Sequence, residues 1–122
     1  MKIEGKKQCV LVVDDHPKVL RFIEIDLKLR GFDVITTTSG SEALELVKSA
    51  KPDIMLLDII MPGMDGFELL KKLRLFTQLP VIAFSASPGN YHDAMRVGAN
   101  DFMSKPFQPD EMVRRINAIL SH

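Results

Sequence analysis

Five short runs rich in β-forming residues recur along the chain, and their β-branched and aromatic content predicts a strand at each. They are CVLVV, DVITT, IMLLD, VIAFS and DFMS, at residues 9–13, 33–37, 54–58, 81–85 and 101–104. The first, third and fourth runs are almost continuously apolar instead of alternating with polar residues. Continuous runs of this kind are typical of strands that are covered on both faces, as in a parallel sheet.

Segments with the helical spacing of apolar residues lie between and after these runs. They span residues 17–30, 41–50, 66–75, 91–97 and 109–120. In the first segment, Leu20, Ile23 and Leu27 fall on one face. Strands that alternate with helices predict an α/β fold, with a parallel sheet and right-handed crossovers.

The ends of several helices carry their own signals. Ser39 followed by Glu42 predicts a capping box, and Asp65 is a good N-cap for the third helix. The segment 91–97 has the weakest pattern, and residues 88–90, Pro-Gly-Asn, resist helix formation before it. The fourth helix is therefore expected to be short, about two turns.

Length and composition fit one soluble domain, which we assign to residues 1–122. The 16 basic and 16 acidic residues cancel, so charge favours neither nucleic acid nor an anionic membrane as a partner. Cys9 is the single cysteine and cannot form an internal disulfide, which indicates a reducing compartment. The apolar run at 9–13 is too short for a signal or a membrane span. We therefore expect a cytoplasmic protein.

Polar residues follow the predicted strands at the edge where ligands bind in such sheets. Asp14 and Asp15 follow the first strand, and Asp58 ends the third. The fourth strand ends in Ser85, and Lys105 follows the fifth. Since the carboxyl ends of parallel strands share one edge, these side chains are expected to converge.

Three converging carboxylates repel one another in a partly dry site and need a cation. Oxygen ligands suit Mg²⁺, which proteins hold with carboxylates, waters and a phosphate. Asp58 is then best interpreted as a nucleophile that accepts a phosphoryl group as an acyl phosphate. Lys105 and Ser85 would neutralise charge on the transferring oxygens.

Four motifs together resemble the receiver domain of two-component response regulators, the CheY-like domains. They are VVDDHP, LLDIIMPGMDGFELL, VIAFSA and ANDFMSKPF, and the similarity covers about residues 8–120. The resemblance implies a flavodoxin-like, doubly wound, five-stranded parallel sheet in the order 2-1-3-4-5, with helices on both faces. It also implies a phosphoacceptor that takes part in phosphoryl transfer, including its own phosphorylation and dephosphorylation, and is not an enzyme in the ordinary sense.

The resemblance also assigns roles to residues. Asp58 would be the phosphoacceptor, and Asp14 and Asp15 would bind Mg²⁺ with it and with the backbone carbonyl of Ile60. Lys105 would bind the phosphoryl group.

The switch and the partners are implied in the same way. Ser85 would hydrogen-bond the phosphoryl group, Phe102 would be the aromatic switch residue, and Lys105–Pro106 would be a cis peptide. The donor would be a phosphohistidine on a sensor histidine kinase or a histidine phosphotransfer protein. The readout would be a downstream protein partner or an output domain not in this chain, with no direct nucleic-acid or membrane binding.

Other interpretations remain open at this point. A flavin- or nucleotide-binding module of the flavodoxin-like fold would want a Gly/Ser/Thr-rich first loop, but this loop reads DDHPK. An aspartate-nucleophile phosphatase usually has a second acid two residues on, where this chain has Ile60. A receiver-like interaction module that is not regulated by phosphorylation is a third alternative. Phe102 could be plain core, and His16 is interpreted as a surface residue.

A second apolar stripe runs along the first predicted helix. It consists of Phe22, Ile25 and Leu29, and at helical spacing it lies away from the stripe that faces the sheet. The alternative is that these are ordinary exposed apolar residues. We interpret the stripe as a docking surface for the phosphodonor, as is common for the first helix of the resembled family.

Overall fold

A five-stranded parallel sheet forms the centre of the computed structural model, which describes residues 7–121. Its strands are β1 (Cys9–Val13), β2 (Asp33–Thr37), β3 (Ile54–Asp58), β6 (Val81–Ser85) and β7 (Asp101–Ser104). The strands lie in the order β2-β1-β3-β6-β7, and every pair is parallel. The bounds of the five predicted strands are confirmed. The order 2-1-3-4-5 is also confirmed, with β6 and β7 as the fourth and fifth long strands.

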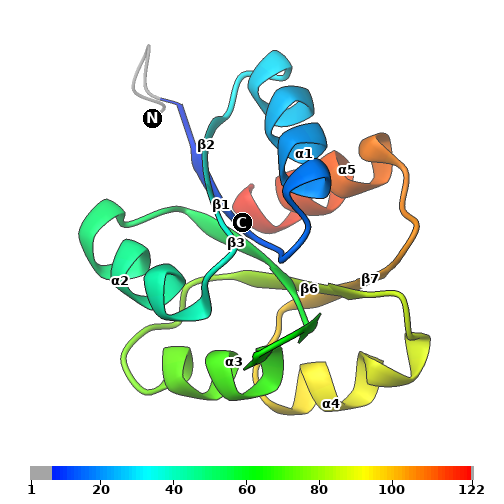
Figure 1. Cartoon of the computed structure of the whole chain (residues 1–122). Helices are drawn as coiled ribbons and strands as arrows, with labels where there is room; N and C mark the ends of the chain where they lie inside the picture. The colour runs from blue at the N-terminus through cyan, green and yellow to red at the C-terminus, as the bar shows by residue number, and fades with distance from the viewer. Residues whose placement is uncertain (1–6, 122) are drawn as a thin grey trace.

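Helices cover both faces of this sheet (Figure 1). On one face lie α1 (Pro17–Leu29) and α5 (Pro109–Leu120). On the other lie α2 (Gly40–Ala50), α3 (Gly66–Arg74) and α4 (Tyr91–Arg96). The doubly wound, flavodoxin-like arrangement is therefore confirmed, and each helix ends within one residue of its predicted bounds.

Alternate residues of the central strands point to opposite faces and build two apolar cores. Val10 and Val12 of β1 pack with the helices α1 and α5, whereas Leu11 and Val13 pack with α2, α3 and α4. The strand β3 is buried along its whole length. A strand that is covered on both faces holds the residue at its end, Asp58, in a fixed position.

The start of α2 differs from the predicted capping box in one contact. The Ser39 hydroxyl accepts a hydrogen bond from the Glu42 backbone N–H at 3.2 Å, as expected. The Glu42 carboxylate, however, accepts from the Thr37 hydroxyl and does not return to Ser39. The Ser39 N–H instead donates to Thr37 Oγ1 at 3.0 Å. Thr37 completes the cap because β2 ends there, directly before the helix.

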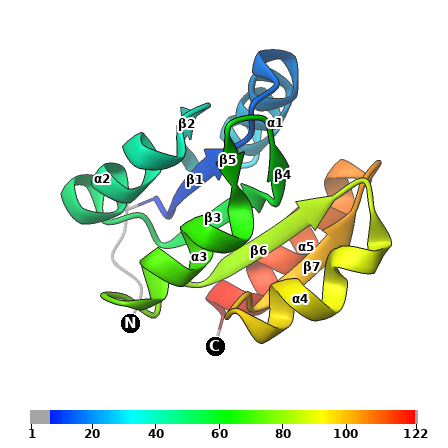
Figure 2. The same cartoon turned by 60° about the horizontal axis from the view of Figure 1, so that its bottom comes forward.

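A small antiparallel hairpin, which the sequence pattern did not predict, lies between β3 and α3 (Figure 2). Its strands are β4 (Ile60–Met61) and β5 (Met64–Asp65). The Asp65 carboxylate accepts from the Phe67 N–H at 2.8 Å, which confirms the predicted N-cap of α3. Gly66 donates its N–H to the Ile59 carbonyl at 3.0 Å. The start of α3 is thereby fixed against the residue that follows Asp58.

The fourth helix is short, as predicted. A single 3₁₀ turn, η1 (Pro88–Asn90), precedes it, and α4 itself has only six residues. Proline and glycine disfavour an α-helix, and the regular helix begins only after them, at Tyr91.

Candidate acceptor site at the carboxyl edge of the sheet

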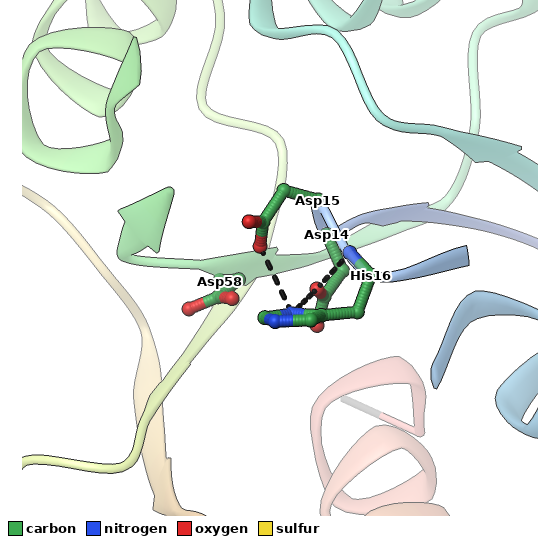
Figure 3. Close-up of side chains that lie close together, drawn as sticks. All are labelled: Asp14, Asp15, His16 and Asp58. Carbon is green, nitrogen blue, oxygen red and sulfur yellow. Dashed lines mark hydrogen bonds and ion pairs between the residues drawn. The ribbon is translucent and has the colours of Figure 1, made fainter. Parts of the chain in front are cut away.

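The three predicted acids come together at one edge of the sheet (Figure 3). Asp14 and Asp15 directly follow β1, and Asp58 is the last residue of the neighbouring strand β3. Ligand atoms of these acids and of His16 all lie within 4.8 Å of one another. We call Asp14, Asp15 and Asp58 the acidic cluster. The predicted convergence is confirmed, because neighbouring parallel strands end at the same level.

Asp58 is almost completely buried, with 3% of its surface exposed. Its Oδ1 accepts a hydrogen bond from the Ile60 N–H at 3.1 Å, and its Oδ2 contacts Lys105 Nζ at 3.2 Å. Burial raises the pKa of Asp58, the Lys105 charge partly opposes this, and the nearby Asp14 adds to it. The carboxylate is therefore held firmly in a site that disfavours its negative charge.

Lys105 reaches this site from the loop after β7. Its Nζ lies 3.2 Å from Asp14 Oδ2 and 3.2 Å from Asp58 Oδ2, and 5.1 Å from the centre of the Phe84 ring. Burial lowers the pKa of Lys105, but the charges of Asp14 and Asp58 outweigh burial and raise it. The lysine is thus a cation placed between two carboxylates, and the predicted cis peptide at Lys105–Pro106 is present.

His16 belongs to this site, although the sequence indicates only a surface residue. Its backbone N–H donates to Asp14 Oδ1 at 2.9 Å. Its ring Nδ1 lies 3.1 Å from Asp14 Oδ1 and 3.0 Å from Asp15 Oδ1, although 63% of the side chain is exposed (Figure 3). His16 is therefore a surface residue, as interpreted, but its ring also lies against the two acids, a contact that the sequence did not predict. Its position directly after two acids was the available signal.

The acidic cluster suits a hard divalent cation. Asp15 Oδ1 is buried, and it has no hydrogen-bond partner among residues 7–121; the approach of His16 Nδ1 lacks the geometry of a hydrogen bond. A buried carboxylate oxygen without a donor is costly unless a cation satisfies it. The donors from the three acids are all oxygens, which are the ligands that Mg²⁺ prefers. The residues present therefore fit a metal ion.

Ser85 ends β6, the strand beside β3, and its side chain is fully buried. In the strand register Asp58 pairs with Phe84, so Ser85 lies one residue beyond the level of Asp58. Its Oγ accepts hydrogen bonds from the Ser87 N–H at 3.0 Å and from Asn90 Nδ2 at 2.9 Å. Asn90 is a second residue that the sequence pattern did not single out, since nothing in the pattern marks a contact across five residues.

Phe102 lies in β7 with 7% of its surface exposed, on the sheet face that α4 covers. The ring of Tyr91 meets it edge to face, with 5.8 Å between the ring centres. Tyr91 itself is 46% exposed. The aromatic pair connects the core under α4 with the molecular surface.

The second stripe of α1 is exposed, as predicted, with 56%, 45% and 84% of the surface accessible at Phe22, Ile25 and Leu29. An apolar groove of about 430 Å³ begins beside Phe22. Its lining residues are Val19, Phe22, Ile23, Ala86, Lys105, Pro106 and Phe107. Ile25 and Leu29 do not line this groove, so the structure brings only Phe22 of the stripe close to Lys105.

Comparison with known proteins gives a family. The model of the response regulator receiver domain matches residues 10–117. The alkaline phosphatase synthesis transcriptional regulatory protein PhoP of Bacillus subtilis is 37% identical over 91% of this chain and 48% of its own length. The chain thus spans about half the length of the curated relatives it matches.

Solved structures agree with this assignment. The Francisella response regulator 1452 receiver domain has a TM-score of 0.88 and 36% identity, over 94% of this chain and 98% of its own. The beryllofluoride-activated N-terminal receiver domain of Klebsiella pneumoniae RstA has a TM-score of 0.88 and 31% identity, over 94% of this chain and 100% of its own. Among residues 7–121 no helix is long and apolar enough to cross a membrane.

The residues that carry the sequence motifs lie together at the acidic cluster, and the family match covers nearly the whole chain. Domains of this family are phosphoacceptors and not ordinary enzymes. The chain belongs to the receiver domains of two-component response regulators.

Proposed function

We propose that this domain accepts a phosphoryl group on Asp58 from a phosphohistidine of a sensor histidine kinase or histidine phosphotransfer protein. One observation carries the proposal. The buried Asp58 carboxylate is fixed at the end of β3, and Lys105 Nζ lies 3.2 Å from one of its oxygens. A held carboxylate with an adjacent cation suits in-line attack on phosphorus.

The residues divide the work of the transfer. An Asp58 oxygen forms the new bond to phosphorus while the bond from phosphorus to the histidine nitrogen breaks, and that nitrogen keeps the electron pair. Lys105 neutralises charge on the transferred oxygens. Mg²⁺, held by the acidic cluster with the backbone carbonyl of Ile60, would supply further charge neutralisation when bound.

Two further residues are assigned to the switch. The Ser85 hydroxyl would donate a hydrogen bond to the phosphoryl group, and Phe102 would change its packing in response. The same site would also allow phosphorylation by small donors and hydrolysis of the acyl phosphate. The change would be read by a protein partner or by an output domain not in this chain. We assign no direct role in nucleic-acid or membrane binding to these 122 residues, whose formal net charge is zero.

Treatment with acetyl phosphate tests the function. In Mg²⁺ the intact mass is expected to rise by one phosphate, and peptide mapping should place the phosphate on Asp58. Excess EDTA should suppress the reaction, because Asp14, Asp15 and Asp58 then lack the cation that offsets their charge. Uptake on another residue, or no uptake in Mg²⁺, would overturn the proposal.

The groove beside Phe22 is proposed as the docking site for the helix that carries the donor phosphohistidine. Lys105 lines this groove and also contacts Asp58, so a partner seated there would lie next to the acceptor. The exposed stripe of Phe22, Ile25 and Leu29 extends the apolar surface along α1. An apolar groove that meets an exposed apolar stripe fits one face of an amphipathic helix.

Replacing Phe22 by alanine is expected to slow transfer from the cognate phosphodonor by roughly tenfold, since truncation of a central aromatic contact commonly costs more than 1 kcal/mol. Phosphorylation by acetyl phosphate should stay unchanged, because a small donor does not need the docking groove. Leu75→Ala is the matched control, since Leu75 is 86% exposed and follows α3, on the other face of the sheet. Unaltered transfer to the Phe22 variant would contradict this docking site.

A further inference from the structure

Asn90 holds the buried hydroxyl of Ser85 from outside the sheet. Its Nδ2 donates to Ser85 Oγ at 2.9 Å, and the Ser87 N–H donates to the same oxygen at 3.0 Å. A hydroxyl oxygen has two acceptor sites, so both are used by the loop that follows β6. The side chain of Ser85 is thus engaged with its own loop.

We propose that Asn90 is a positioning residue that holds Ser85 in the resting arrangement and releases it on phosphorylation. The inference rests on the proposed role of Ser85 toward a phosphoryl group on Asp58. Asp58 lies on the neighbouring strand, whereas Asn90 lies in the 3₁₀ turn after β6. On this proposal the Ser85 hydroxyl rotates toward the neighbouring strand to donate its hydrogen to the phosphoryl group, and its oxygen then moves away from Asn90 Nδ2. The Asn90 bond therefore favours the resting state alone.

Tyr91, the next residue along the chain, connects this turn to Phe102, the second switch residue. Tyr91 follows Asn90 directly, and its ring packs edge to face against Phe102 at 5.8 Å. The start of α4 thereby contacts both Ser85 and Phe102. When the hydrogen bond between Asn90 and Ser85 breaks, the first turn of α4 can move. The packing of Tyr91 against Phe102 then weakens as well. One short turn links the two residues.

Tyr91 also supplies a way to observe the release. It is the only tyrosine of the sequence, which has no tryptophan. Its fluorescence therefore reports on this turn without added labels. Titration of the metal-loaded protein with beryllofluoride, a mimic of the phosphoryl group, should change the signal as Tyr91 leaves Phe102.

Asn90→Ala is expected to bind beryllofluoride more tightly than the parent, by about three- to tenfold, because a hydrogen bond made only in the resting state is lost. Gly89→Ala is the matched control in the same turn, since a Cβ there meets only Ser87 Oγ, at 3.9 Å. It should bind the mimic as the parent does. A residue that merely stabilised the loop would leave the affinity unchanged or weaken it when removed.

A double variant separates the effect of the hydrogen bond between Asn90 and Ser85 from other effects of Asn90. In a Ser85→Ala background the Asn90→Ala change should alter the affinity for beryllofluoride by less than twofold, because the bond is already absent. Equal or weaker binding by Asn90→Ala alone, or an undiminished effect without the Ser85 hydroxyl, would overturn the inference. A parent protein that bound no beryllofluoride would refute the proposed function itself, and the inference with it.

Discussion

Asp58→Asn is expected to abolish phosphate uptake from acetyl phosphate and, without metal, to make the protein more stable than the parent. Uptake ends because an amide oxygen is a poor nucleophile and forms no acyl phosphate. Stability rises because the parent buries a carboxylate beside Asp14 and Asp15. The amide has nearly the same shape and carries no charge, so the repulsion is relieved. Intact mass and urea unfolding in EDTA measure the two effects.

The higher stability of Asp58→Asn over the parent should depend on pH, and the direction follows from the pKa of Asp58. Burial raises the pKa of Asp58 above its value in the unfolded chain, although the Lys105 charge opposes the rise. The folded state therefore binds the proton more tightly, and the parent loses stability as pH rises through the folded pKa of Asp58. The advantage of the variant should appear across that window and vanish below the unfolded pKa.

In Mg²⁺ the order of stability should reverse, so that the parent is more stable than Asp58→Asn. The ion binds the folded acidic cluster and raises the melting temperature of the parent by mass action. The variant retains only two of the three carboxylates and should gain less. Asp93→Asn is the control for loss of an acid, since Asp93 is exposed and pairs with Arg96 on α4. A variant that still accepts phosphate, or one that is less stable than the parent in EDTA, would contradict the assignment.

The sequence predicts the sheet well because each long strand is a short run of β-forming residues, and three of the five runs are almost continuously apolar. Right-handed crossovers then bring the strand ends to one edge, so the closeness of Asp14, Asp15 and Asp58 follows from topology. The exposure of the Phe22 stripe follows from the helical period. These features depend on average burial, which a pattern of apolar positions reports directly.

Contacts set by local backbone geometry were not predictable in this way. His16 meets two carboxylates because the turn after β1 brings its ring back over them, and a single histidine has no periodicity. Asn90 reaches Ser85 through a 3₁₀ turn. Thr37 replaces half of the expected capping box because the end of β2 lies against α2. Each depends on a few dihedral angles and not on hydrophobic pattern.

The hairpin after β3 was likewise not predictable from the apolar pattern. It is followed by Gly66, the first residue of α3, which leads to a further prediction. Strands of two residues, as in β4 and β5, are too short to show alternation. The apolar pattern also gives no sign that the backbone of Gly66 lies directly on Ile59. A Cβ at Gly66 would lie 2.6 Å from both Ile59 Cα and the Ile59 carbonyl oxygen. Backbone atoms cannot move aside as a flexible side chain does.

Gly66→Ala is expected to lower the free energy of unfolding by about 1–3 kcal/mol, the usual cost of overpacking. Alanine is the better helix former, by roughly 0.5–1 kcal/mol, so a net loss would show that the clash with Ile59 dominates. Urea unfolding measures this change in the free energy of unfolding. Phosphorylation by acetyl phosphate should also slow, because Ile59 precedes the Ile60 N–H that donates to Asp58 Oδ1 at 3.1 Å.

Gly89→Ala provides the matched control for this change, since its added Cβ would make only an ordinary van der Waals contact, with Ser87 Oγ at 3.9 Å. That variant should unfold at the same urea concentration as the parent or slightly above it, because alanine restricts the unfolded chain. If Gly66→Ala behaved like Gly89→Ala in both unfolding and phosphorylation, the contact between α3 and Ile59 would not hold the acceptor in place. A loss confined to Gly66→Ala would show that the first residue of α3 positions Asp58 through the backbone alone.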